Sequence, residues 1–130
     1  MVEINLFIAK AERYLQSAEL LLNNGDYDSS VSRVYYAMFH LANGLLLTKG
    51  ITASTHKGTL LLFGEHFIKT DICPKEMSQA LKLAHDDRQS GDYDVYEMIE
   101  EEEARLLLEK GRYFMKQTRL YLEQQNLANS

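Results

Sequence analysis

The sequence contains little cysteine, proline or tryptophan: Cys73 and Pro74 are the single residues of their kinds, and there is no Trp. One cysteine cannot form an internal disulfide, and no group of Cys and His residues at metal-ligand spacing surrounds it. We therefore expect a reducing, cytoplasmic environment. With one proline and few β-branched runs, the chain also lacks the many turns and strands that an all-β sandwich requires.

Long apolar runs and an excess of positive charge are missing as well. Charged residues interrupt every apolar stretch before it is long enough to span a bilayer, and no basic start followed by an apolar run suggests a signal peptide. We expect neither export nor a membrane partner. The formal net charge of -5 argues against strong binding to duplex DNA, which needs clustered Lys and Arg.

What is present fits one globular domain over residues 1–130, with 45% hydrophobic and 25% charged residues. Apolar residues recur at three- and four-residue intervals, which predicts an all-α fold. A first helix over Ile4–Leu22 should end at Asn23-Asn24-Gly25. Asp26 or Asp28 should cap a second helix over Tyr27–Thr48. This helix is apolar nearly all round, so we expect it to be central and to leave room for a homodimer interface.

A third helix should begin after a cap at Ser54-Thr55 and continue through Phe67. Gly58 and Gly64 weaken it by up to about 1 kcal/mol each, so we expect close helix packing to require their small size. Together with two further long helices, this predicts an up-and-down bundle of about five helices, four of which form the main bundle.

The fourth helix should start at Pro74 and end near Asp87 or Arg88, because Ser90-Gly91-Asp92 indicates a break. A last helix is expected from about Val95 to Gln124. Its acidic run, Glu100 to Glu103, would lie near the positive end of the helix dipole. Its packing seam should consist of Leu107, Gly111, Phe114, Thr118 and Tyr121.

Three polar stretches are candidates for a site, and the first lies in the second helix. Arg33, Tyr36 and His40 are spaced by three and four residues, so they share one helix face and can line a cleft. The alternative is structural: Tyr35 and Tyr36 bury their rings at the core edge while Arg33 stacks or pairs at the surface.

The second stretch, Thr55-His56-Lys57-Gly58-Thr59, lies at an expected helix start. Unpaired backbone N–H groups there favour an anion, so His56 and Lys57 can contact a phosphate. Equally, Thr55 can cap the helix while His56 covers the core edge and Lys57 is solvated.

The third stretch, Arg88 to Tyr93 followed by Tyr96, places a guanidinium beside a carboxylate and two phenols. Arg88 can bind a phosphate with its planar set of donors, and Asp92 can orient it. The alternative is an Arg88–Asp92 ion pair that braces the break between two helices.

Other site types find no support in the sequence. There is no GxGxxG, GxxxxGK[ST], HExxH or GxSxG motif and no paired Glu-x-x-His, so we expect no metal and no cofactor. Cys73 has no assignable base and is expected to be a buried or capping residue. His66 and His85 are interpreted as ordinary residues of a helix surface or core edge.

The chain resembles the HEPN-domain family, in its small single-domain prokaryotic branch. The resemblance rests on Tyr35-Tyr36-Ala37-Met38-Phe39-His40, on Thr55-His56-Lys57-Gly58, and on Arg88 with Asp92-Tyr93. It covers nearly the whole chain. It implies a helical bundle that forms a homodimer and has a minimal nucleotidyltransferase as partner, commonly as a toxin–antitoxin system.

The sequence departs from the family pattern at one position of the expected ribonuclease site. HEPN ribonucleases carry an Arg, then four to six further residues, then a His, and two such motifs form a metal-independent site across the dimer. Here the Arg corresponds to Arg88, but Tyr93 stands where the His is expected, and no His follows. Arg33 and His40 have the bare spacing but lie in the second helix. A tyrosine is a poor base at neutral pH because its pKa is near 10.

Three functions remain open at this point. The first is a binding protein that contacts a nucleotide or RNA through Arg88, His56, Lys57, Tyr36, His40 and Arg33, without strong nuclease activity. In some family pairs the nucleotidyltransferase adds AMP to a nearby tyrosine, and Tyr93 and Tyr96 are the nearest candidates. The second is a variant ribonuclease using Arg88, Asp92 and Tyr93. The third is a non-catalytic helical scaffold.

Overall fold

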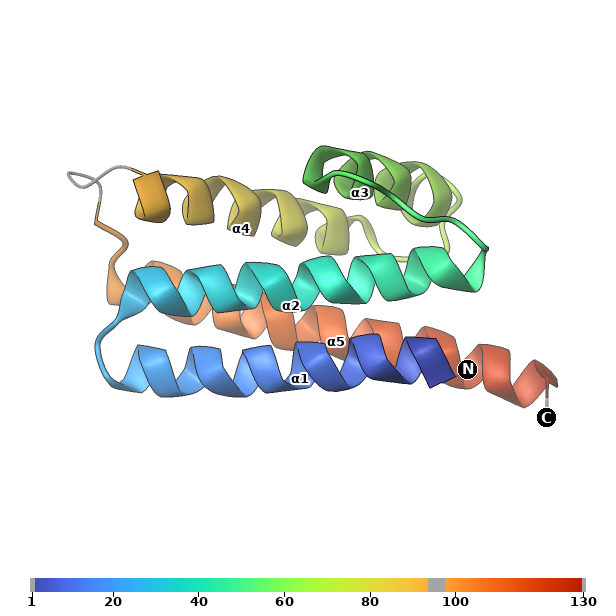
Figure 1. Ribbon diagram of the computed structural model, residues 1–130, viewed down its shortest axis with the longest axis horizontal. Helices are drawn as coiled ribbons and strands as arrows, with labels where there is room; N and C mark the ends of the chain where they lie inside the picture. The colour runs from blue at the N-terminus through green and yellow to red at the C-terminus, as the bar shows by residue number, and fades with distance from the viewer. Residues whose placement is uncertain (1, 94–97, 130) are drawn as a thin grey trace.

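The computed structural model describes residues 2–93 and 98–129, with side chains described for 3–89 and 98–125. Its long helices are α1 (Val2–Asn23), α2 (Tyr27–Thr48), α4 (Lys75–Tyr93) and α5 (Glu101–Asn129). They run alternately in opposite directions (Figure 1). The short α3 (His56–Phe63) and the turn η1 (Gly64–Ile68) join the end of α2 to α4. The all-α, up-and-down architecture with four main helices is therefore confirmed.

The α1–α2 hairpin forms where the turn residues predict it. Gly25 has φ +82°, a conformation that glycine adopts without steric cost, and the carboxylate of Asp26 accepts a hydrogen bond from the Ser29 N–H at 3.3 Å. Asp26 is thus the cap. Asp28 instead accepts a bond from the Ile99 N–H at 3.3 Å, which holds the segment before α5 against the start of α2.

Helix α2 is central, as its apolar pattern predicts. It packs against α1, α3, α4 and α5, and Ser30 on it donates a 2.7 Å hydrogen bond to the Ala18 carbonyl of α1. Its buried side chains form the middle of the core and include Val31, Val34, Tyr35, Met38, Leu41, Ala42, Leu45 and Leu46.

The α3 region differs in part from the expectation. Thr55 caps α3 by accepting from the Gly58 N–H at 2.9 Å, but the helix then widens into the π-helical turn η1. A Cβ on Gly58 would lie 2.9 Å from the Thr55 hydroxyl, whereas one on Gly64 would meet nothing within 4 Å. Close helix packing as the reason for both glycines is therefore wrong: Gly58 makes room for the cap, and Gly64 has no packing constraint.

Two expected boundaries near the end of α4 are also wrong. The helix continues through Ser90-Gly91-Asp92 to Tyr93, because the propensity cost of about 1 kcal/mol for one glycine does not stop a helix whose earlier turns pack on α2. An α5 start at Val95 falls in 94–97, outside the described residues. Residues 98–100 are not helical and α5 begins at Glu101, later than expected; Glu101 to Glu103 of the acidic run lie in its first turn, and Glu100 directly precedes them.

Helix α5 contacts α1, α2 and α4 along its expected seam. Leu107 and Phe114 are fully buried and Thr118 nearly so. Gly111 lies where α5 packs closely on α1 and α2: an added Cβ would lie 2.9 Å from Val34 Cγ1 and 3.0 Å from Leu15 Cδ2. Among the described residues, no helix combines the length and apolarity needed to cross a membrane.

Gly111→Ala should lower the free energy of unfolding by about 1 kcal/mol. Overpacking two helices costs about 1–3 kcal/mol, and the better helix propensity of alanine returns about 1 kcal/mol. Gly64→Ala is the matched control and should be neutral or stabilising, because its Cβ enters open space. Urea unfolding of both variants measures this, and equal stability of the two would contradict the packing.

Candidate functional site

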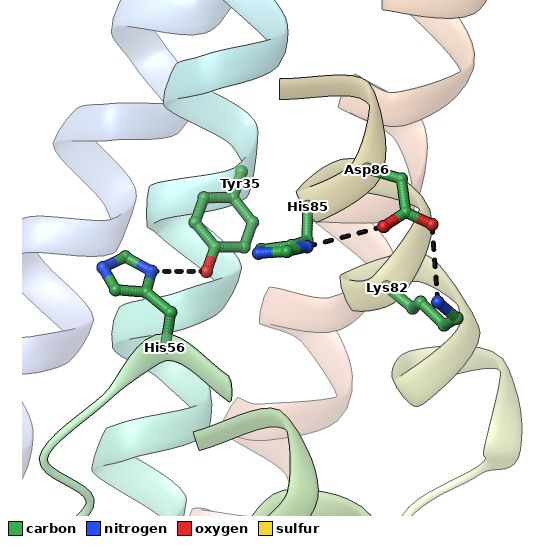
Figure 2. Close-up of polar contacts among 5 residues, drawn as sticks. All are labelled: Tyr35, His56, Lys82, His85 and Asp86. Atoms are coloured by element: carbon green, nitrogen blue, oxygen red, sulfur yellow. Dashed lines mark hydrogen bonds and ion pairs between the residues drawn. The ribbon is translucent and has the colours of Figure 1, made fainter. Parts of the chain in front are cut away.

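Tyr35 lies at the centre of a cluster built from three helices. Its residue is fully buried on α2, and its hydroxyl lies 2.7 Å from Nδ1 of His56 at the start of α3. The Tyr35 ring also lies 5.4 Å, centroid to centroid, from His85 on α4. Figure 2 shows the phenol between the two imidazoles. The hydrogen bond therefore joins a buried residue of the core to an exposed residue at the start of α3.

The electrostatics of this pair favour neutral groups. Burial raises the pKa of Tyr35 to about 12, against the opposing effect of Arg88, so the hydroxyl keeps its proton at neutral pH. The pKa of His56 is lowered, first by desolvation and then by the charges of Arg88 and His85. Because a hydroxyl both donates and accepts, the hydrogen bond fits either neutral tautomer of His56. The outer nitrogen, Nε2, is then either a donor or a proton acceptor.

Arg88 of α4 joins the same cluster. Its guanidinium carbon lies 5.6 Å from the Tyr35 ring centroid and 5.1 Å from that of Tyr36. His56 lies 6.1 Å from the Tyr36 ring and stacks on Phe39 at 4.3 Å and 12°. Two residues that the sequence proposes separately as phosphate contacts, His56 and Arg88, thus lie against the same pair of tyrosine rings. A guanidinium and an imidazole beside aromatic rings suit a phosphate attached to a base.

The row on α2 extends this cluster toward α1. Tyr14 of α1 stacks on His40 at 5.5 Å and 10°, and its ring lies 6.1 Å from Tyr36. The Arg33 guanidinium lies 5.4 Å from the Tyr14 ring centroid. Arg33, Tyr36 and His40 therefore do share one face. Both the binding and the structural interpretation of this row remain open. Arg33 lies over a ring, as the structural interpretation expects, and the residue is exposed, as ligand binding requires.

The remaining candidates are Lys57, Asp92, Tyr93 and Tyr96. Lys57 is exposed at the start of α3, beside His56. The backbones of Asp92 and Tyr93 belong to α4, but their side chains lie outside the described part of the chain, as does all of Tyr96. The Arg88–Asp92 pair and the roles of Tyr93 and Tyr96 stay predictions.

Sequence reasoning missed His85 and Tyr14. The His85 side chain is 22% exposed, and its Nδ1 lies 3.5 Å from Asp86, which in turn pairs with Lys82 at 3.5 Å (Figure 2). One signal was available: His85 precedes Arg88 by three residues, which puts both on one face of a helix.

The Cys73 thiol takes no part in this site. The thiol is buried, and burial raises its pKa to about 11, so it is protonated and inert at neutral pH. This confirms the expectation that Cys73 is buried. Within the part of the chain that the structure describes, no three His, Cys, Asp or Glu side chains gather as metal ligands.

Comparison with known proteins identifies the family. The sequence model of the HEPN domain matches residues 4–121. The chain belongs to the HEPN-domain family. Among its HEPN relatives, a toxin candidate from Methanocaldococcus jannaschii is 42% identical over 125 residues, which cover 96% of this chain and 85% of that protein. A UPF0332 protein from Thermotoga maritima is 36% identical, covering 82% and 80% of the two chains. One from Archaeoglobus fulgidus is 33% identical, covering 92% and 94%.

The stability of this HEPN protein should fall as the pH is lowered from about 7 to about 5. The pKa of His40 is lowered by burial and then by Lys10 and His56, and that of His56 is lowered as described above. Below pH 6.5 the unfolded chain therefore binds protons that the folded state resists, and stability is lost as the pH falls through the folded pKa values.

Urea unfolding at a series of pH values measures this effect. The variant His40→Gln/His56→Gln should show a flatter profile above pH 5, where carboxylates such as Glu101, whose pKa is lowered by Arg105 and Tyr27, contribute little. An equally steep profile in the double variant would contradict the assignment.

Proposed function

We propose that this protein is the toxin-like member of a cytoplasmic toxin–antitoxin pair, that it acts as a homodimer with a minimal nucleotidyltransferase as partner, and that it binds a nucleotide or RNA. The observation that carries the binding proposal is the placement of His56 and Arg88 against the rings of Tyr35 and Tyr36.

This geometry supports a phosphate ligand for two reasons. The Arg88 guanidinium offers several N–H donors to phosphate oxygens, and His56 adds a donor when Nε2 carries the hydrogen. Lys57 adds a positive charge at the N-terminus of α3, where the helix dipole also favours an anion. In a chain with a formal net charge of -5, such a local group of cationic residues is a selective place for a phosphate.

The toxin role rests on relatives. The 42% identical protein of M. jannaschii is named as a toxin candidate, and a second candidate from the same organism is 33% identical over 82% of this chain. The homodimer and the nucleotidyltransferase partner rest on the family resemblance.

Arg88→Gln should weaken binding of AMP and of a short single-stranded RNA by at least tenfold, because it removes the charged donors at the phosphate. Lys82→Gln is the matched control: it removes one positive charge from the exposed side of the same helix and should leave affinity within about twofold. Isothermal titration calorimetry gives the affinities. Loss of thermal stability with no change in affinity would favour the scaffold function instead.

The partnership has its own test. The purified protein is mixed with the nucleotidyltransferase encoded beside it and ATP, and analysed by gel filtration and mass spectrometry. We expect a complex, and the mass of one added AMP on Tyr93 or Tyr96. No complex and no added mass would contradict the proposed pairing.

A second candidate function is metal-independent RNA cleavage, which the position of His56 favours. The motif that begins at Arg88 lacks its imidazole, and His56 supplies one near the Tyr36 ring, to which the Arg88 guanidinium is also close. When Nδ1–H of His56 donates to Tyr35, Nε2 is free to take the proton of a ribose 2′-hydroxyl. The 2′-oxygen then attacks phosphorus, the bond from phosphorus to the 5′-oxygen breaks, and that oxygen leaves with a proton from water, giving a cyclic phosphate. Asp92 and Tyr93 are further candidates in this site.

His56→Gln and Arg88→Gln should each reduce cleavage of single-stranded RNA in the presence of EDTA by about 10²-fold or more, as expected for loss of a general base or of charge stabilisation. His66→Gln, which alters an imidazole in η1, should retain the activity. The cleavage hypothesis fails if the unaltered protein does not cut RNA or if cutting survives the Arg88 change.

A further inference from the structure

The face shared by α1 and α2 carries a groove with a strongly biased lining. Two adjoining hollows of about 290 and 300 Å³ share Tyr14 and Arg33. The first is completed by Lys10, Arg13 and Ser17, and the second by Ser29, Ser32 and Tyr36. The lining therefore combines three cations with hydroxyl groups and two phenol rings, and contains no carboxylate.

The positive charge of this groove is not neutralised by neighbouring acids. In residues 3–89 and 98–125, Lys10, Arg13 and Arg33 take part in none of the ion pairs within 4.0 Å. The opposite side of α1 behaves differently. There, Glu12 pairs with Arg119 at 2.7 Å and Glu19 pairs with Arg112 at 2.9 Å. On the side of α1 that faces α5, the charges of acidic and basic side chains therefore cancel. On the side that faces α2, the positive charges are not cancelled in this way.

The groove leads to the candidate site. The Tyr36 ring lines the second hollow and also lies 5.1 Å from the Arg88 guanidinium carbon, so Tyr36 belongs to both places. Along α1, the seven steps from Lys10 to Ser17 span about 10 Å at 1.5 Å per residue. That length exceeds one phosphate group. Cations at intervals with aromatic rings between them are the features that hold the backbone and bases of a single strand.

We propose that this groove binds the phosphodiester backbone of a single-stranded RNA, which continues over Tyr36 to His56 and Arg88. The proposal rests on the proposed function, since it extends the ligand of that site from one nucleotide to a strand. Lys10, Arg13 and Arg33 contact successive phosphates, and the rings of Tyr14 and Tyr36 stack on bases. The strand is single because stacking on Tyr14 and Tyr36 requires unpaired bases.

The test is fluorescence anisotropy with a labelled oligouridylate of about ten nucleotides, within the usual range for single-strand sites. Lys10→Gln/Arg13→Gln should weaken binding at least tenfold and reduce the slope of log K against log salt by about 1.4, the value for two lost contacts to a single strand. The matched control, Arg112→Gln/Lys116→Gln, removes the same charge from the hollow between α1 and α5 and should bind within about twofold of the unaltered protein. All four substituted residues are exposed, and circular dichroism checks the fold.

AMP binding separates this proposal from the proposed function. The groove variant should bind AMP normally, whereas Arg88→Gln should lose both AMP and the oligouridylate. Unchanged oligouridylate binding in the groove variant, or equal losses in the groove and control variants, overturns the groove. So does equally tight binding of a duplex of the same length. If the unaltered protein binds AMP but not the oligouridylate, only the groove fails; if it binds neither, the proposed function fails too.

Discussion

A buried hydroxyl must be hydrogen-bonded, and Tyr35 places one in the middle of the most enclosed helix of this protein. Its partner is the imidazole of His56, which is the first residue of the short helix α3. Satisfying that hydroxyl brings α3 to the same place where α4 presents Arg88. The Tyr35 side chain therefore does two things: its hydrogen bond satisfies a buried hydroxyl, and it holds His56 in the candidate site.

The cluster around Tyr35 also sets the charge states of its members. Desolvation and two nearby basic side chains keep His56 neutral, and burial keeps the Tyr35 proton in place. The guanidinium of Arg88 remains as the fixed charge. An anion entering here would relieve the repulsion between Arg88 and a protonated His56, so ligand binding and protonation of His56 are expected to reinforce each other.

The sequence predicts those features that depend on neighbours along the chain. The bounds of α2, the Asp26 and Thr55 caps and the α5 seam follow from local turn residues and periodicity. The end of α4 does not, because tertiary packing outweighs the weak propensities of Ser90-Gly91-Asp92. The meeting of His56 and Arg88, 32 positions apart, depends on how α3 and α4 pack on α2, and no local pattern encodes it.

The placement of Arg88 and His56 against the same tyrosine rings is the central feature of the candidate site, and an NMR titration of the His56 imidazole tests it. In the unaltered protein His56 should titrate below its ordinary pKa of 6.5, and Arg88→Gln should move the value upward because a nearby positive charge is removed. Lys82→Gln should leave it in place. A His56 pKa at or above 6.5 that does not respond to Arg88→Gln would show that the two groups do not meet.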